Sequence, residues 1–225
     1  MRWNVYISKY MNKEVQAHGF RWEREISCNV YGATHEELKT IPYTNKSDLP
    51  ANFNQIDSCD VSIKTTKSKN TVCMADCLRV FDSVSSGSPM HVTVIYYKQC
   101  DNLKKIITIT EVDLTDSRKL LFGTVTRRQL EKLDAAVKSV PRNRKPTKAE
   151  HTKMWNIQKI LKVLSGAIYF NIKCNTTQSR LQCSFNKFQN FIEKNPSRII
   201  ANSNTNEFRG GVISSEIISQ RRVFK

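Results

Sequence analysis

Three segments in the first half of the chain have the polar and apolar alternation, or the β-branched and aromatic content, that is typical of β-strands. They are residues 59–66 (CDVSIKTT), 91–99 (HVTVIYYKQ) and 104–114 (KKIITITEVDL). In the first segment, Val61 and Ile63 are expected to point inward, and the outward side is expected to carry Asp60, Ser62 and Lys64. The CDNL sequence between the last two segments fits a hairpin turn.

Other segments have the spacing of amphipathic helices, which the pattern predicts at residues 13–30, 126–140 and 151–168. Their expected inward residues are, in order, Val15, Phe20, Trp22 and Ile26; Leu130, Leu133 and Val137; and Ile157, Ile160, Leu161 and Leu164. Thr34 followed by Glu37 has the spacing of a helix-capping box. Residues 179–192 are compatible with a strand or a helix, and Gly210-Gly211 predicts a tight turn. Helices and strands together indicate an α/β or α+β protein.

The charge of the chain is unevenly distributed. The 225 residues carry 36 Lys and Arg and 20 Asp and Glu, a net charge of +16. Residues 1–141 hold 20 basic and 16 acidic side chains, a net of +4, and residues 142–225 hold 16 and 4, a net of +12. The basic, Pro-bounded stretch at residues 141–148 is typical of a loop. We therefore expect a core domain at 1–141 and a basic lobe at 142–225 that binds a polyanion, with nucleic acid as the leading candidate.

Several classes are disfavoured. No apolar run reaches the roughly 18 residues that span a bilayer, and the first residues lack the pattern of a signal peptide. The seven cysteines are expected to be reduced thiols, with a zinc site that includes Cys73 and Cys77 as the alternative to simple burial. The three tryptophans are expected in the core. A cytoplasmic protein without a membrane partner is the expectation.

The strand at residues 59–66 also carries candidate chemistry. Lys64 is surrounded in sequence by Asp48, Asp57 and Asp60. Carboxylates beside a lysine suit phosphodiester hydrolysis, because the carboxylates can hold Mg²⁺ and the ammonium can stabilise the charge that develops on the phosphate. A solvated strand face with mixed charges is the alternative interpretation.

Residues 23–79 resemble the PD-(D/E)xK nuclease superfamily, and more narrowly its type II restriction endonucleases. The resemblance rests on four segments: RWEREI (21–26), YTNKSDLP (43–50), VSIKTT (61–66) and ADCLRVFD (75–82). It implies a restriction-endonuclease-like core with a central mixed β-sheet flanked by helices. It also implies Lys64 as the catalytic lysine, Asp48 as a metal ligand, Glu23 as a supporting ligand, and Arg79 facing the site or the DNA.

One position departs from the pattern of this family. The acid that usually stands two residues before the lysine is Ser62 here. The backbone carbonyl of Ile63 would remain a metal ligand, and Glu23 or Asp57 would replace the missing carboxylate. Asp48 and Asp57 are alternatives for the principal ligand, and the family-like setting favours Asp48.

The candidate DNA contacts lie mostly in the second half of the chain. Arg and Gln side chains can bind guanine and adenine edges, and alternate residues of a strand would share one face: Gln178, Arg180, Gln182 and Ser184. A polar face that touches only phosphates or solvent is the alternative. Arg209 precedes two glycines that would let the backbone approach a phosphate. A further phosphate clamp is expected from Arg142, Arg144 and Lys145.

Together these features predict a Mg²⁺-dependent, sequence-specific endonuclease for double-stranded DNA. A homodimer is expected, because two identical sites related by a two-fold axis cut both strands of a palindrome. A type II restriction enzyme also implies a cognate DNA methyltransferase as its functional companion. The alternatives are a structure-specific repair or junction nuclease of the same fold, and a non-catalytic nucleic-acid-binding protein.

Overall fold

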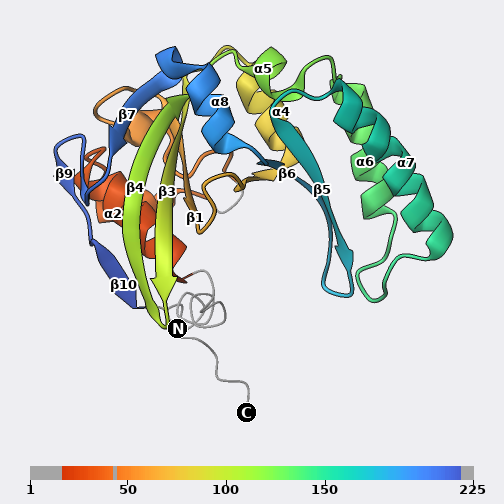
Figure 1. Cartoon of the computed structure of the whole chain (residues 1–225), viewed down its shortest axis with the longest axis horizontal. Coiled ribbons are helices and arrows are strands. Elements are labelled where there is room, and N and C mark those ends of the chain that lie inside the picture. Colours follow the sequence, from red (N-terminus) through yellow and green to blue (C-terminus); the bar gives the residue numbers. More distant parts are fainter. Residues whose placement is uncertain (1–16, 43–44, 219–225) are drawn as a thin grey trace. The chain divides into compact units, whose positions relative to one another are not determined.

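The computed structural model describes residues 17–42 and 45–218, and it confirms a mixed α and β architecture. The chain divides into two compact units that are interleaved in sequence (Figure 1). Unit 1 comprises residues 1–68, 91–112 and 199–225, and unit 2 comprises residues 69–90 and 113–198. This division differs from the expected boundary at residue 141, because the C-terminal segment returns to the sheet of unit 1.

Unit 1 is built on a five-stranded sheet with the order β1-β3-β4-β10, and β7 also pairs with β4. Its strands are β1 (Asp60–Thr66), β3 (Met90–Cys100), β4 (Leu103–Asp113), β7 (Ile199–Ser203) and β10 (Glu216–Ile218). Its helices are α2 (Ala17–Asn29), α3 (His35–Thr40) and the 3₁₀ turn η1 (Ala51–Phe53), and a two-stranded ribbon joins β8 (Glu207–Phe208) to β9 (Gly211–Val212). The predicted strands and the predicted hairpin at residues 100–103 are therefore confirmed.

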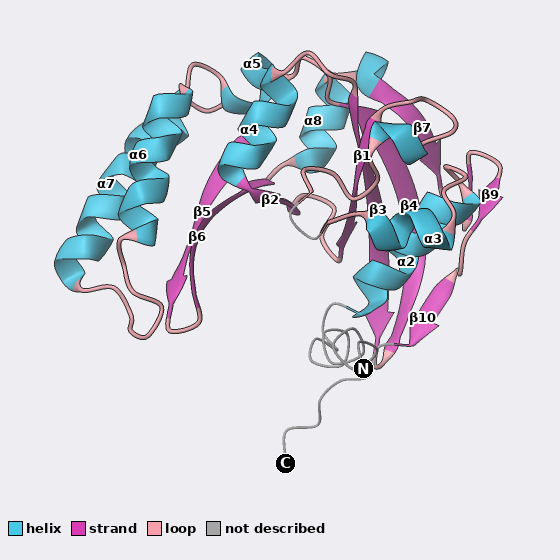
Figure 2. Cartoon of the chain, turned by 180° about the vertical axis from the view of Figure 1, so that it is seen from behind, coloured by secondary structure: helices cyan, strands magenta, loops and turns pink. Residues whose placement is uncertain are grey.

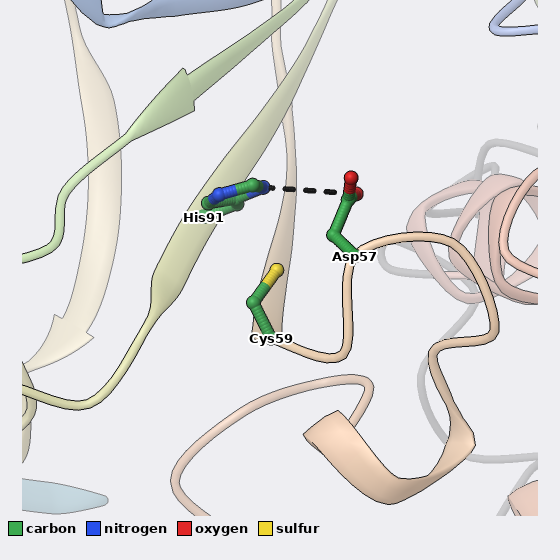
Figure 3. Close-up of side chains that lie close together, drawn as sticks. All are labelled: Asp57, Cys59 and His91. Atoms are coloured by element: carbon green, nitrogen blue, oxygen red, sulfur yellow. Dashed lines mark ion pairs between the residues drawn. The ribbon is translucent and has the colours of Figure 1, made fainter.

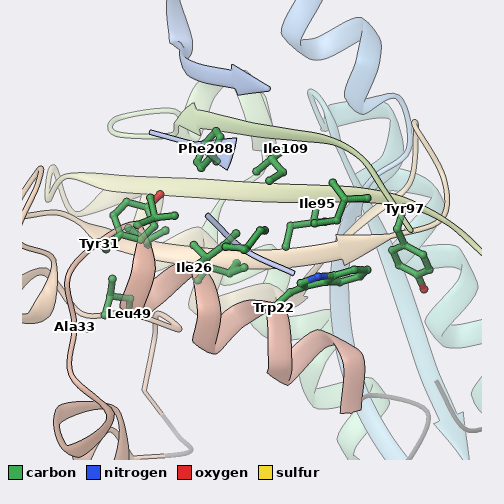
Figure 4. Close-up of a cluster of buried hydrophobic side chains, with 14 of the residues drawn as sticks. Trp22, Ile26, Tyr31, Ala33, Leu49, Ile95, Tyr97, Ile109 and Phe208 are labelled. Carbon is green, nitrogen blue, oxygen red and sulfur yellow. The ribbon is translucent and has the colours of Figure 1, made fainter. Parts of the chain in front are cut away.

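Helix α2 packs its apolar side on the sheet of unit 1 (Figure 4). Trp22 and Ile26 are fully buried, as their spacing predicts, and the Trp22 ring lies 5.6 Å from that of Tyr97 on β3. The indole Nε1 of Trp22 donates to Ser214 O at 2.8 Å, so the ring satisfies its one polar atom as it is buried. The prediction was wrong for Phe20, which is 39% exposed, and Val15 lies outside the described residues.

The alternation expected along β1 was only partly right. Val61 and Ile63 are buried, but Asp60 and Ser62, which were expected to face solvent, are buried as well. The cause is the segment before the strand, where Leu49 forms an antiparallel bridge to Val61. Asp60 is satisfied there by the backbone N–H of Ala51, at 3.0 Å, and by an ion pair with Lys46.

Unit 2 combines a three-stranded antiparallel sheet, in the order β2-β6-β5, with a set of helices (Figure 2). The strands are β2 (Val72–Asp76), β5 (Ile168–Asn175) and β6 (Gln178–Phe185). The helices are α4 (Cys77–Ser85), α5 (Arg118–Phe122), α6 (Arg127–Lys138), α7 (Lys148–Leu164), α8 (Phe188–Lys194) and the 3₁₀ turn η2 (Pro196–Arg198). Residues 179–192, which the sequence left open, form most of a strand and then the start of a helix.

Of the two helices predicted in unit 2, one is confirmed and the other is corrected in its bounds and its buried side. Helix α6 is confirmed, with its three expected inward residues fully buried. Helix α7 begins earlier than predicted, at a capping box of Thr147 and Glu150, and ends at Leu164. The expected stripe was wrong at Ile160, which is 61% exposed, and it omitted the buried Met154. The predicted helix extended to residue 168, which is instead the first residue of strand β5.

The predicted tight turn lies one residue earlier, at Arg209-Gly210, where it joins β8 to β9, and Gly211 begins β9. Gly210 has a φ of +83°, which favours glycine. Gly211 is required for a different reason, because a Cβ there would lie 2.3 Å from the backbone oxygen of Asn29 on α2. The second glycine therefore serves the approach of this ribbon to a helix, where the sequence suggested an approach to DNA.

These two glycines supply a matched pair of variants. Gly211→Ala should lower the free energy of unfolding by about 3 kcal/mol, because the new methyl group collides with backbone atoms that cannot move aside cheaply. Gly210→Ala meets no atom within 4 Å and should cost about 1–2 kcal/mol, through its left-handed backbone alone. Urea unfolding of both variants measures the difference, and equal losses would contradict this account.

Candidate functional site

The candidate active site is organised around one carboxylate oxygen in unit 1. Asp48 Oδ2 accepts hydrogen bonds from Ser62 Oγ at 3.0 Å, from the backbone N–H of Ile63 at 2.7 Å and from Lys64 Nζ at 2.6 Å. Asp48 reaches this position because its own backbone N–H donates to Val61 O, beside the Leu49–Val61 bridge. All three donors contact Oδ2, and no described residue donates to Oδ1.

Glu23 completes this group from helix α2. Burial and, after it, the nearby negative charge of Asp48 raise the pKa of Glu23 to about 8, against the opposing charges of Lys64 and Arg24. The carboxyl group accepts no hydrogen bond from any described residue. Glu23 is therefore a half-buried carboxylic acid close to a second carboxylate, with the ammonium of Lys64 beside both.

The residues that the sequence singled out around Lys64 are thus brought together: Glu23, Asp48, Ser62, Ile63 and Lys64. Ser62 does not replace the missing acid chemically, since its hydroxyl donates to Asp48. The carbonyl of Ile63 accepts from Lys64 Nζ at 3.2 Å. The Asp48 carboxylate, the Glu23 carboxyl group and this carbonyl offer oxygen atoms of the kind that could hold Mg²⁺.

The raised pKa of Glu23 predicts a specific pH dependence of stability. The folded state holds this pKa above its value in the unfolded chain, so the stabilising contribution is complete below about pH 4.5 and is lost as the pH rises through about 8. Glu23→Gln should flatten the unfolding free energy across this window, measured by urea titration in EDTA. Glu193→Gln, at an exposed position of α8, is the control and should retain the wild-type slope. An unchanged slope in Glu23→Gln would contradict the assignment.

Asp57, the alternative metal ligand, belongs to a second cluster in unit 1. Arg209 binds it through both guanidinium NH₂ groups, at 2.5 and 2.9 Å, and also donates to the fully buried Glu111 at 2.9 Å. His91 Nδ1 lies 2.8 Å from the other oxygen of Glu111. Arg209 is thus engaged inside unit 1, and we do not include it among the proposed DNA contacts.

The charges of this second cluster reinforce one another. Burial alone would lower the pKa of His91, but hydrogen bonds to Cys59 and Glu111 outweigh burial and raise it to about 10. Hydrogen bonds from Arg209 hold the pKa of Asp57 below its usual value. Cationic His91 and Arg209 therefore face anionic Asp57 and Glu111.

The same cluster offers a second set of metal donors. Asp57, Cys59 and His91 each present one ligand atom within 4.8 Å of the others, and they could hold a metal ion (Figure 3). Oxygen, sulfur and nitrogen together suit Zn²⁺ better than Mg²⁺. His91, Cys59 and Glu111 lie on different segments and have no motif spacing, so the sequence does not single them out.

Loss of the Arg209 side chain should lower the stability of the folded protein. Arg209→Met should lower the free energy of unfolding by about 3–5 kcal/mol, because it leaves Glu111 and Asp57 with His91 as their remaining cation in a largely buried place. The matched control is Arg127→Met, which breaks ion pairs with Asp82 and Glu131 whose side chains are about half exposed, and its effect on stability should be much smaller than that of Arg209→Met. Similar losses in chemical denaturation of the two variants would refute the importance of the buried cluster.

The expected DNA-binding strand is β6 of unit 2. Gln178, Arg180 and Gln182 are partly or fully exposed, as their alternation predicts. Ser184 was expected on the same face, but it is buried and accepts a hydrogen bond from Asn171 at 2.9 Å, so it is not available to DNA. Across the ladder, Lys173 pairs with Arg180, which places two cations next to each other.

The other predicted contacts are scattered over unit 2. Arg79 is exposed on α4, whose first turn is capped by Asp76. Arg142 and Lys145 are exposed in the loop before α7, whereas Arg144 is held by Glu150 through two hydrogen bonds of 2.7 and 2.6 Å. Unit 2 carries 20 basic and 8 acidic side chains, a net of +12, against 16 and 12, a net of +4, for unit 1.

Comparisons with protein-family models, curated proteins and solved structures return no match to this chain. Within the described part of the chain, no helix combines the length and apolar character needed to cross a membrane.

Proposed function

We propose that this protein is a Mg²⁺-dependent endonuclease that cleaves double-stranded DNA at specific sequences, in the manner of a type II restriction enzyme. The observation that carries this proposal is the convergence of Glu23, Asp48 and Lys64, from a helix, a loop and a strand, on one half-buried place. Structural ion pairs rarely need a second carboxyl group whose pKa is raised toward neutrality. The order of helix, aspartate segment and lysine strand resembles the PD-(D/E)xK core.

Each residue of the site has a role in this proposal. Asp48 and Glu23, with the carbonyl of Ile63, would hold Mg²⁺, which polarises the scissile phosphate and lowers the pKa of a bound water. Ser62 keeps the Asp48 carboxylate in its orientation. Lys64 supplies a positive charge to the phosphate or orients the attacking water.

Unit 2 supports the proposal by its charge and by the exposed face of β6. A net charge of +12 provides attraction to phosphates that does not depend on sequence. Arg180, Gln178 and Gln182 supply donors and acceptors that can distinguish bases. Such an enzyme is expected to act as a homodimer in the cytoplasm, with a cognate DNA methyltransferase as its functional companion.

Ser62 favours a second candidate, a non-catalytic nucleic-acid-binding protein, because the usual acid is missing. A structure-specific nuclease of the same fold is the alternative among enzymes. Incubation of a long DNA duplex and, in parallel, of branched and damaged DNA with Mg²⁺, followed by sequencing of the fragment ends, separates the three. Ends at one sequence of the duplex support a restriction enzyme, cleavage confined to branched or damaged DNA supports the structure-specific enzyme, and no cleavage of any substrate supports the binding protein.

Removal of the site lysine provides the direct test. Lys64→Ala should lower the cleavage rate by about 10²–10³-fold, because a charge that stabilises the transition state is lost, while DNA binding without metal is retained. Lys67→Ala, at an exposed position just after β1, removes the same charge and should cleave at the wild-type rate. Undiminished cleavage by Lys64→Ala would overturn the assignment. Asp48→Asn and Asp57→Asn discriminate between the two candidate ligands, and only the first should abolish cleavage.

A further inference from the structure

A groove of about 340 Å³ lies between α7 and β5 in unit 2. Strand β5 is at the edge of its sheet, and one side of α7 follows it. Helical spacing places His151, Trp155 and Gln158 along the groove, and Tyr169 and Asn171 line it from the strand. None of the lining residues is acidic.

Two of the three aromatic residues of the groove, Trp155 and Tyr169, are at least partly exposed, whereas Phe170 belongs to the core. Trp155 is 50% exposed, contrary to the expectation from the sequence, whereas Trp22 is fully buried. Lys159 Nζ lies 5.3 Å from the Trp155 ring centre, and Lys162 Nζ lies 5.6 Å from that of Tyr169. Exposed aromatic rings accompanied by cations are the combination that binds unstacked bases next to their phosphates.

The polar residues of the groove retain acceptors. Gln158 Nε2 donates to Phe170 O at 2.5 Å, and Asn171 Nδ2 donates to Ser184 Oγ at 2.9 Å. These bonds fix the two amides, and no described residue donates to their oxygens. Every nucleobase with an exposed N–H edge offers a donor for such oxygens.

We propose that this groove binds a single unpaired nucleobase of DNA. Its volume is near the lower end of the range of about 300–1,000 Å³ found for small-ligand sites, which suits one base better than a larger ligand. Stacking on Trp155 and Tyr169 supplies the affinity, and the amides hold the edge of the base. The inference rests on the nucleic-acid-binding part of the proposed function and not on cleavage.

The test uses three short DNA duplexes and the full-length protein in EDTA. One duplex is fully paired, one carries a single unpaired thymine, and one carries an abasic nucleotide at the same position, which keeps the flexibility and removes the base. The wild-type protein should bind the unpaired thymine about 5- to 150-fold more tightly than either of the others. Equal affinity for the thymine and abasic duplexes would overturn the proposal.

The variant test locates the effect in the groove. Trp155→Ala should remove the preference for the unpaired thymine and leave the affinity for the paired duplex unchanged, and Trp155→Phe should restore part of it. Ile160→Ala, on an exposed part of the same helix outside the groove, is the control and should behave as wild type. A preference that survives in Trp155→Ala refutes the groove, while a failure to bind any of the three duplexes refutes nucleic-acid binding itself.

Discussion

Unit 1 depends on the need to satisfy a carboxylate that is removed completely from water. An isolated buried carboxylate is too costly to persist, so Glu111 on β4 requires cationic partners. His91 supplies one from β3, and Arg209 supplies the other from the turn between β8 and β9. Arg209 in turn binds Asp57, which comes just before β1. One buried charge thus ties together four segments that are far apart in sequence.

The pairing of Asp57 with Arg209 also positions the candidate active site. Because Asp57 is held by Arg209, the start of β1 is fixed only a few residues before Ser62 and Lys64. The bridge from Leu49 to Val61 then brings Asp48 against the strand. Arg209 is fully occupied by its two acids, so Lys64 remains the cation that contacts Asp48 among the described residues. Lys64 thus lies beside both acids of the site, Asp48 and Glu23.

Local signals in the sequence predicted much of this structure, and signals that depend on tertiary contacts did not. Alternation predicted β1, β-branched and aromatic content predicted β3 and β4, and helical spacing predicted α6, because each of these signals lies within one short segment. The boundary between units could not be found, because the return of residues 199–218 to the sheet of unit 1 leaves no mark in composition. Arg209 and Trp155 were misjudged for a related reason: the sequence shows the type of a side chain but not the partner that it meets.

The serine at the usual acid position is consistent with the charges around it. Glu23 and Asp48 already place two carboxyl groups beside one lysine, and the pKa of Glu23 is raised to about 8 as a result of burial and of Asp48. A third carboxylate at residue 62, which is buried, would add a further like charge within the same small volume. A hydroxyl there instead donates a hydrogen bond to Asp48 Oδ2. Ser62 and Glu23 therefore have complementary roles. Helix α2 contributes the acid Glu23, and strand β1 contributes Ser62, whose hydrogen bond orients Asp48.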